Sequence, residues 1–208
     1  MTGRERLHTA IAGGSVRPSP VLCWAPDPRA DGVVSFARPD EGQAWWPPVK
    51  NPFGRAQDQG LDVRAWLESD PGKAEAALET LKSQTQVEIE RARQDGADGV
   101  VYLLFGATAA ESTPMEYGGH WLEIDRSLLR DASLPVLVYV LGDEEPYIDF
   151  VSDLPCQAFG FDPKAFPLGE ARALRQGPLA LPEPSAEIYL VDKYETAEPW
   201  LDRQEVPA

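Results

Sequence analysis

Acidic side chains stand at two points where this sequence passes from an apolar run into polar residues. Asp143 follows the run Pro135–Leu141, and Asp162 follows the run Gln157–Phe161. Carboxylates at such points could hold a divalent cation together, or one could be kept protonated for general acid chemistry. Alternatively, Asp143 caps the short helix after it, and Asp162 caps the loop that leads into Pro163. We take both as candidate catalytic residues that would handle protons.

Aromatic residues and one further acid extend this candidate site. Tyr139 lies inside the apolar run before Asp143, where its phenol could orient a ligand or could be a core group that needs one hydrogen-bond partner. Trp24 and Phe105 stand at the ends of two other apolar runs, and Glu111 lies in the loop after the second run. We expect Trp24, Phe105 and Glu111 to contact a small organic ligand if these runs are strands whose ends meet.

Histidine and cysteine add no recognisable catalytic or metal centre. His8 and His120 are the two histidines, and they are too far apart along the chain to suggest a metal site or a Ser–His triad. Cys23 and Cys156 form no CxxC pair, and no base is evident beside Cys23. We therefore expect no metal and no cofactor, and we expect reduced thiols, as in a cytoplasmic protein.

Alternating helices and strands must position these residues. The pair Asp70–Pro71 has the N-cap acid and first-position proline of a helix, which should end near Gln94. Thr113–Glu116 has the pattern of a capping box and predicts another helix. The run Gly99–Phe105 is apolar throughout, which is typical of a strand buried on both faces of a parallel sheet. The expected elements are helices over 3–12, 70–94, 113–130, 145–152 and 168–175, and strands over 21–24, 99–105, 135–141, 157–161 and 178–181.

The order of these elements predicts an α/β fold. From residue 61 onward helices and strands alternate, which indicates parallel βα units. A complete (β/α) barrel usually takes roughly 250 residues, whereas this chain has 208. We predict a reduced or incomplete TIM-like barrel with parallel strands, in a single domain over 1–185. Its segment 26–60 is irregular, aromatic and proline-rich, and Val33–Phe36 could form a short strand within it. Residues 186–208 are expected to form an acidic tail, with an edge strand over Ile188–Val191.

The overall charge limits the possible partners. The net charge of −15 and the pI of about 4.5 predict a surface that repels nucleic-acid phosphates and anionic lipids. A polyanionic substrate is also disfavoured unless arginines gather in a pocket. No apolar run approaches the roughly 20 residues of a membrane helix, and the N-terminus lacks the apolar core of a signal peptide. We therefore expect a cytoplasmic protein with no nucleic-acid or membrane partner.

Five segments occur in an order and spacing that is typical of one superfamily. They are RERLHTAIAGGSVRPSPV, IERARQDGADGVVYLLFGA, MEYGGHWLEIDRSLL, PVLVYVLGD and FVSDLPCQAFGFDPKAFPLGEARALRQGPLAL. Together they resemble the uroporphyrinogen decarboxylase superfamily, which includes tetrapyrrole decarboxylases and related corrinoid and thiol methyltransferases. The resemblance covers roughly residues 3–25 and 60–182. It implies a (β/α) barrel with a ligand site at the C-terminal ends of its strands.

The sequence also departs from the pattern of that superfamily. Its methyltransferases carry a His-x-Cys pair that binds zinc on the strand that resembles PVLVYVLGD, and Tyr139 and Leu141 stand at those places here. Neither side chain can replace imidazole or thiolate as a zinc ligand. The arginine-rich N-terminal loop of the decarboxylases and their C-terminal histidine segment have no counterpart. The second to fourth βα units are compressed into residues 26–60.

Two functions from different classes are compatible with this sequence. The first is a divergent uroporphyrinogen decarboxylase-like protein that binds or transforms a small organic ligand at the strand ends; as an enzyme it would be a decarboxylase-like lyase or a methyltransferase-like protein without the zinc motif. The second is a non-catalytic remnant that acts as an oligomerisation or protein-interaction subunit, because lost βα units would leave unpaired strand edges. We predict a homodimer with residues 26–60 in its contact. Trp45 and Trp46 could cover the core, meet a partner or line a ligand pocket.

Overall fold

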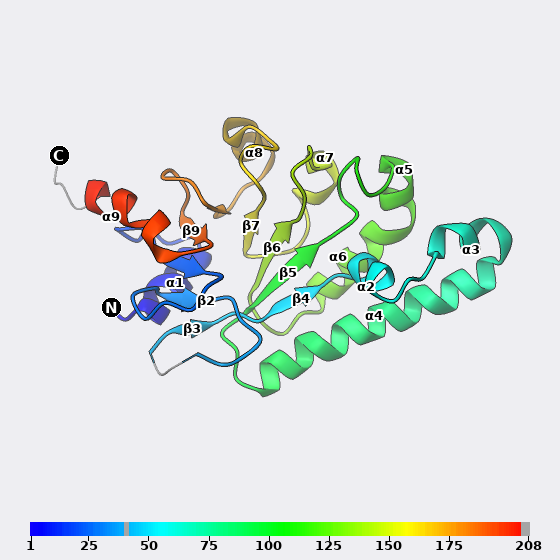
Figure 1. The fold of residues 1–208 in the computed structure, drawn as a ribbon, viewed down its shortest axis with the longest axis horizontal. Coiled ribbons are helices and arrows are strands. Elements are labelled where there is room, and N and C mark those ends of the chain that lie inside the picture. The colour runs from blue at the N-terminus through cyan, green and yellow to red at the C-terminus, as the bar shows by residue number, and fades with distance from the viewer. Residues whose placement is uncertain (40–41, 205–208) are drawn as a thin grey trace.

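Two parallel sheets form the centre of the protein. The computed structural model describes residues 1–39 and 42–204. The strand order is β3-β2-β1-β9-β8 in one sheet and β4-β5-β6-β7 in the other, and all paired strands are parallel (Figure 1). The strands are β1 (Val21–Cys23), β2 (Gly32–Val33), β3 (Ala44–Trp45), β4 (Pro48–Lys50), β5 (Val100–Leu104), β6 (Val136–Val140), β7 (Ala158–Gly160), β8 (Ala180–Leu181) and β9 (Ile188–Val191).

The two sheets join into one ring of strands. β3 and β4 are separated by only two residues, and this extended segment pairs with β2 through β3 and with β5 through β4. At the other seam, Phe159 of β7 forms a parallel bridge with Leu179, which directly precedes β8. Because β9 pairs with both β1 and β8, the ring is continuous. The predicted α/β fold with a reduced TIM-like barrel of parallel strands is therefore confirmed.

Alternate strand residues point into the barrel, where they form an apolar core of their own. Small residues face large ones there, since a Cβ on Gly99 would overlap the Trp46 ring and a Cβ on Gly160 would lie 2.6 Å from the Tyr139 ring. The helix α1 (Gly3–Ile11) closes the N-terminal end, because its buried face packs into the same core. The buried members of this core are Leu7, Ala10, Ile11, Leu22, Val34, Ala44, Trp46, Val101, Leu137, Ala158, Ala180, Ile188 and Leu190.

Helices cover only part of the outside of this ring. The connections β1–β2, β2–β3 and β8–β9 contain no helix among the described residues. Between β4 and β5 the chain forms three helices, and the longest, α4, runs along the outside of the second sheet (Figure 1). After α1, the helices of the described chain are α2 (Pro52–Asp58), α3 (Val63–Ser69), α4 (Pro71–Gln94), α5 (Pro114–Glu116), the π-helical segment η1 (Tyr117–Trp121), α6 (Leu122–Arg130), α7 (Ile148–Val151), α8 (Leu168–Leu174), the 3-10 segment η2 (Tyr194–Thr196) and α9 (Glu198–Gln204).

The helix-start signals in the sequence act as predicted. The Asp70 side chain accepts a hydrogen bond from the Lys73 N–H (3.1 Å) and begins α4, which ends at Gln94. Thr113 likewise accepts from the Glu116 N–H (3.2 Å) and begins the segment α5–η1–α6. No helix in the described part of the chain combines the length and the apolarity that a membrane crossing would need.

Two expectations about the irregular parts of the chain are wrong, and one of the alternatives for Trp45 and Trp46 is confirmed. Residues 26–60 contain three strands and α2 where a long irregular segment was expected, and the short strand suggested at Val33–Phe36 overlaps β2 only at Val33. Trp45 and Trp46 are 6% and 0% exposed, so both belong to the core, which confirms the alternative in which they cover it. Ile188–Val191 is not at an edge, since β9 lies between β1 and β8 and all four of its residues are buried. A closed ring also removes the unpaired strand edges on which the dimer argument depended.

Candidate functional site

An aromatic pair lies at the C-terminal ends of the strands. Tyr139 comes from β6 and points into the barrel, where it packs against the interior core. Its ring meets the ring of Trp24 edge to face, with centroids 6.2 Å apart and an interplanar angle of 71°. Trp24 is held directly after β1, because its N–H donates to the carbonyl of Val191 (3.0 Å) and extends the β1–β9 ladder. The pair therefore forms a half-buried aromatic floor at this end of the barrel.

Two carboxylates lie near the Tyr139 hydroxyl. Asp162 follows β7 by two residues, and Asp192 follows β9 directly. Burial raises the pKa of Tyr139 to about 12, and the negative charges of Asp162 and Asp192 add to the effect. Among the residues that the structure describes, nothing hydrogen-bonds to the Tyr139 hydroxyl. This phenol stays protonated at neutral pH and can donate a hydrogen bond to a ligand.

The two carboxylates differ in how much they are engaged. One oxygen of Asp162 accepts the Lys164 N–H (2.9 Å), so Asp162 shapes the turn after β7 as the loop-capping alternative predicted. Asp162 is half-buried and Asp192 is exposed. The Asp192 side chain has no hydrogen bond or ion pair within the described ranges. Neither carboxylate is neutralised by a described cation, and both can accept hydrogen bonds from a ligand.

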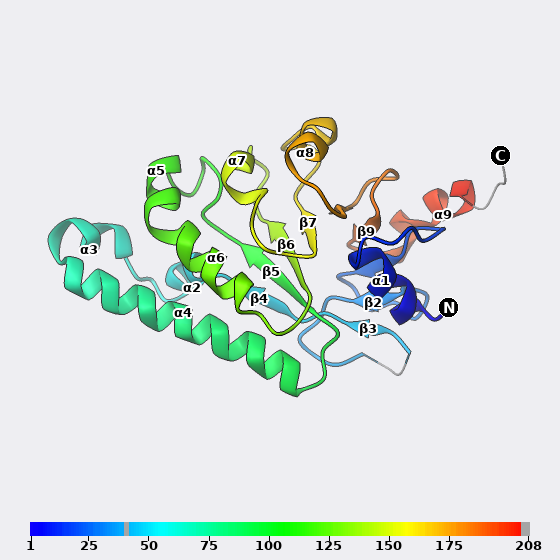
Figure 2. The ribbon, with the colours of Figure 1, turned by 180° about the vertical axis from the view of Figure 1, so that it is seen from behind.

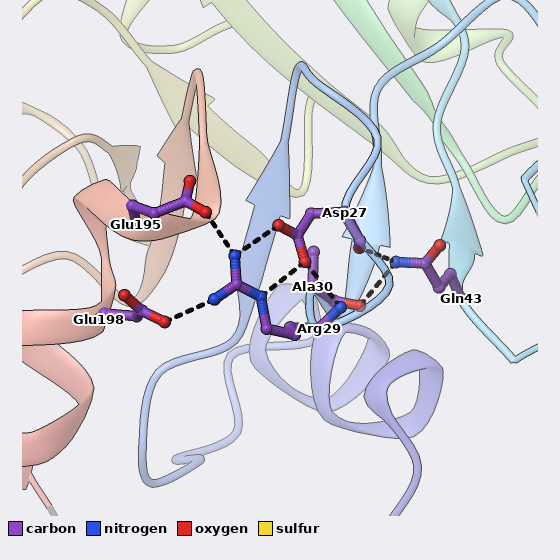
Figure 3. Close-up of polar contacts among 6 residues, drawn as sticks. All are labelled: Asp27, Arg29, Ala30, Gln43, Glu195 and Glu198. Carbon is purple, nitrogen blue, oxygen red and sulfur yellow. Dashed lines mark hydrogen bonds and ion pairs between the residues drawn. The ribbon is translucent and has the colours of Figure 1, made fainter.

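A network around Arg29 supports this rim from the outside (Figure 3). The guanidinium holds both oxygens of Asp27 (2.9 and 2.7 Å) and also pairs with Glu195 (2.5 Å) and Glu198 (2.6 Å). It also stacks on the Tyr194 ring, 4.5 Å from the ring centroid. These contacts raise the pKa of Arg29 and lower that of Asp27. The network joins the β1–β2 connection to the segment after β9, which carry Trp24 and Asp192 respectively.

Gln43 extends the same network towards β3. Its side-chain amide donates to the carbonyls of Asp27 (2.6 Å) and Ala30 (2.9 Å), as Figure 3 shows. The helix-free β1–β2 connection is thus fixed by side chains from two other parts of the chain. Because Arg29 already faces three carboxylates, it is not free to bind an anionic ligand.

The other predicted site residues lie apart from the Tyr139 pair. Asp143 is exposed in the connection after β6, and it makes no hydrogen bond or ion pair with any described residue. Phe105 packs over α2, and the ammonium of Lys50 lies 5.6 Å from its ring centroid. Glu111 accepts the Gly106 N–H (2.5 Å) and so fixes the loop after β5. Of the six candidates, the structure brings together Trp24, Tyr139 and Asp162.

The two histidines are exposed, and the two cysteines are protonated thiols. His8 is exposed and pairs with Asp98 (3.2 Å), and His120 is exposed in η1. Burial raises the pKa of Cys23 to about 12 and that of Cys156 to about 11, which keeps both thiols protonated. Within the described ranges, no three His, Cys, Asp or Glu side chains are grouped as a metal site would require.

A buried polar cluster around Asp125 was not predicted. Asp125 is 1% exposed and accepts hydrogen bonds from the hydroxyls of Tyr102 (2.6 Å) and Tyr117 (2.8 Å) and from the side chain of Asn51 (3.2 Å). Burial raises its pKa to about 6, although all three hydrogen bonds act in the opposite direction. The signal was present in the sequence, because Asp125 falls at helical spacing between the apolar residues Leu122 and Leu129. The cluster ties α6 and η1 to the outer face of the barrel and is structural.

The fold and the rim geometry together define a reduced parallel (β/α) barrel with a candidate ligand site at its C-terminal strand ends. No protein-family model matches this sequence, and comparison with curated proteins finds no relative. Among solved structures, the chain is similar to a methyltransferase from Methanosarcina mazei, with a TM-score of 0.60 and 12% sequence identity. The similarity covers 68% of this chain and 43% of the methyltransferase chain, so this protein spans less than half of that enzyme. At this level of identity the likeness concerns the fold.

Proposed function

We propose that this protein is a minimal, divergent relative of the uroporphyrinogen decarboxylase superfamily that binds a small organic ligand at the C-terminal strand ends. Two independent observations support the relationship. The five sequence segments follow the order of that superfamily, and the fold is similar to that of a methyltransferase. The zinc-binding pair of the methyltransferases is replaced by Tyr139 and Leu141, so the proposed ligand is held without zinc.

The observation that carries the proposal is the unpartnered hydroxyl of Tyr139. The ring of Tyr139 is half-buried against Trp24, whereas its hydroxyl is not one of the described polar atoms that are buried without a partner, so a ligand can reach it. A ligand that accepts a hydrogen bond from this phenol would replace water there, and the net gain from one such bond is about 0.5–1.5 kcal/mol. Catalytic and binding groups of such barrels stand at this end of the strands.

The charges at the rim favour a particular class of ligand. Asp162 and Asp192 lack cationic partners among the described residues, and the only nearby network cation, Arg29, is already paired. Amines or other ligands with N–H groups would complement the carboxylates, and the Trp24 ring could contact an apolar or cationic part. A polycarboxylate such as a tetrapyrrole would be repelled. We therefore propose a small cationic or neutral ligand with N–H donors.

The proposal assigns a role to each residue of the rim. Tyr139 donates a hydrogen bond and orients the ligand, while Asp162 and Asp192 accept hydrogen bonds from it. If the protein is an enzyme, Asp162 is the group placed to exchange a proton with the bound molecule. Asp143, on the exposed loop after β6, would contribute to proton transfer only if that loop folds over the ligand.

Ligand binding can be tested by thermal shift and calorimetry with matched panels of primary amines, amides and carboxylates. We expect amines or amides to stabilise the protein and carboxylates to have no effect. Tyr139→Phe should weaken binding by about tenfold, as expected for one hydrogen bond to a charged or strongly polar group. The control is Tyr147→Phe, since the Tyr147 hydroxyl bonds to the Ser112 carbonyl away from the rim. Preferential binding of carboxylates, or equal binding by Tyr139→Phe, would contradict the proposal.

A second candidate function, a protein-interaction subunit, is favoured by one exposed aromatic residue. Phe36 is 81% exposed and borders a cavity of about 220 Å³ that lies between the segment of Trp45, Pro47 and Pro48 and the C-terminal part of α4. Exposed aromatic area of this kind is often part of an interface. Light scattering should then give twice the monomer mass of 22.8 kDa. Phe36→Asp should give monomers, whereas Val87→Asp, at an exposed position of α4, should not.

A further inference from the structure

We infer that the opposite, N-terminal end of the barrel holds a binding site for a small organic oxyanion. A cavity of about 600 Å³ lies there between the loop after α1 and the connections that lead into β8 and β9. Figure 2 shows α1 beside β9 at this end of the protein. Its volume falls within the roughly 300–1,000 Å³ that is typical of small-molecule sites. The proposal is independent of the Tyr139 rim, which lies at the other ends of the strands.

Arg17 gives this cavity an unpaired positive charge. Arg17 is exposed, lines the cavity, and has no carboxylate partner in the described part of the chain. The acid in the cavity wall, Glu187, is already engaged, because one oxygen pairs with Arg172 (2.7 Å) and the other accepts the Leu179 N–H (3.0 Å). The charge of Glu187 is offset by Arg172, so the charge of Arg17 remains uncompensated in a chain whose net charge is −15. A free guanidinium is well suited to bind a carboxylate or a phosphate group through two hydrogen bonds.

Backbone groups of the same loop add further hydrogen-bond donors. The N–H groups of Ala12, Gly13 and Gly14 are used by the last carbonyls of α1 (3.1, 2.9 and 2.9 Å). The next two N–H groups, of Ser15 and Val16, donate to no described residue, and both residues line the cavity. The carbonyls of His8, Thr9 and Ala10 already have partners and do not compete for these donors. Successive free N–H groups beside an arginine are a recurring way to bind an anion.

Hydroxyl groups suggest the rest of the ligand. Ser15 and Ser185 line the cavity from the loop after α1 and from the connection into β9, and the Ser185 carbonyl is already bonded to Arg172 (2.7 Å). Most of the other residues that line the cavity are glycine, alanine, valine or proline. A phosphate ion alone would occupy only a part of about 600 Å³. The geometry thus fits a small hydroxylated molecule that carries one phosphate or carboxylate group.

The test is a nuclear magnetic resonance titration of ¹⁵N-labelled protein with inorganic phosphate, glycerol 3-phosphate and glycerate, at constant ionic strength. We expect saturable shifts of the amides of Ser15, Val16, Arg17 and Gly177 with at least one organic anion, and weaker binding of inorganic phosphate. Tighter binding of glycerol 3-phosphate would identify the group as a phosphate, and tighter binding of glycerate as a carboxylate. Absence of saturable shifts in this loop with all three probes would overturn the inference.

Variants separate a site from general charge attraction. Arg17→Ala should weaken binding by about tenfold or more, and Arg17→Lys should weaken it less, because it keeps the charge but loses the paired donors. The matched control is Arg38→Ala, since Arg38 also lacks an ion-pair partner among the described residues but does not line this cavity. Unchanged affinity in Arg17→Ala, or an equal loss in Arg38→Ala, would contradict the inference. Circular dichroism establishes that each variant is folded.

Discussion

Replacing Asp125 by asparagine should change how the stability of the protein depends on pH. The pKa of Asp125 is raised from 3.8 to about 6 in the folded protein, with burial as the main cause. Below about pH 4 the carboxyl is protonated in both the folded and the unfolded chain. As the pH rises, the unfolded chain releases this proton first, so unfolding becomes more favourable. Above about pH 6 both states are ionised, and the penalty is then constant.

The size of this effect follows from the two pKa values. A difference of about two units, at roughly 1.4 kcal/mol per unit, gives about 3 kcal/mol. The wild-type protein should therefore lose about 3 kcal/mol of unfolding free energy between about pH 4 and pH 7, relative to Asp125→Asn. Asparagine has nearly the same shape, and its oxygen can still accept the hydrogen bond from Tyr102. A constant offset is expected as well, because the introduced side-chain amide would face the amide of Asn51.

Urea unfolding monitored by tryptophan fluorescence at several pH values measures this difference. The other carboxylates are common to both proteins, so their titration cancels in the comparison. Asp149→Asn, on an exposed position of α7, is the control and should give a difference that does not change with pH. A flat difference for Asp125→Asn, or one that grows in the opposite direction, would refute the assignment of a raised pKa. Should Asp125→Asn fail to fold, Tyr117→Phe removes one hydrogen bond that lowers this pKa and should steepen the loss of stability.

Three further changes test the packing of the barrel and its rim. Trp46→Ala removes a fully buried ring from the barrel interior and should cost about 3–5 kcal/mol in urea unfolding. Gly160→Ala places a Cβ in overlap with the Ala180 carbonyl oxygen and 2.6 Å from the Tyr139 ring, and it should cost about 1–3 kcal/mol or more through overpacking, whereas the exposed Gly169→Ala in α8 should cost nothing measurable. Arg29→Met should speed hydrogen exchange of the amides in Ala197–Leu201, as high salt should in the wild type, because the ion pairs to that segment are lost.

The long elements could be predicted because their signals are local. Asp70–Pro71 and Thr113–Glu116 each combine a capping side chain with a proline at the first helical position, and both begin helices where expected. β5 and β6 are apolar throughout, as parallel strands buried on both faces must be. α2 was missed although Asn51–Pro52 carries the same kind of signal, because the surrounding prolines and aromatics suggested a loop.

The short strands could not be predicted because no local pattern distinguishes them. β2 and β3 have two residues each, and they are strands only because their neighbours in the ring supply the hydrogen bonds. Trp46 stands directly before two prolines and so suggests a loop, yet the absence of a side chain on Gly99 makes room for its ring inside the barrel. β9 lies in an acidic stretch, and the apolar run Ile188–Val191 alone does not tell an edge strand from a central one.

The candidate site was only partly predictable for a similar reason. Trp24, Tyr139 and Asp162 stand at strand ends in the sequence, and the parallel order of the strands brings those ends together. Asp192 was missed because β9 was expected at an edge, away from the rim. The Arg29 network joins residues more than 160 positions apart, and such long-range ion pairs leave no pattern in the sequence.

The most direct test of the central claim is the nuclear magnetic resonance signal of the Tyr139 Cζ atom in protein labelled with ¹³C-tyrosine. The signal is assigned by its loss in Tyr139→Phe and then followed as a primary amine, an amide and a carboxylate of similar size are added. A ligand site at the strand ends predicts a saturable shift of this signal with the amine or the amide. No shift with either molecule, or a shift that the carboxylate alone produces, would contradict the proposed ligand site.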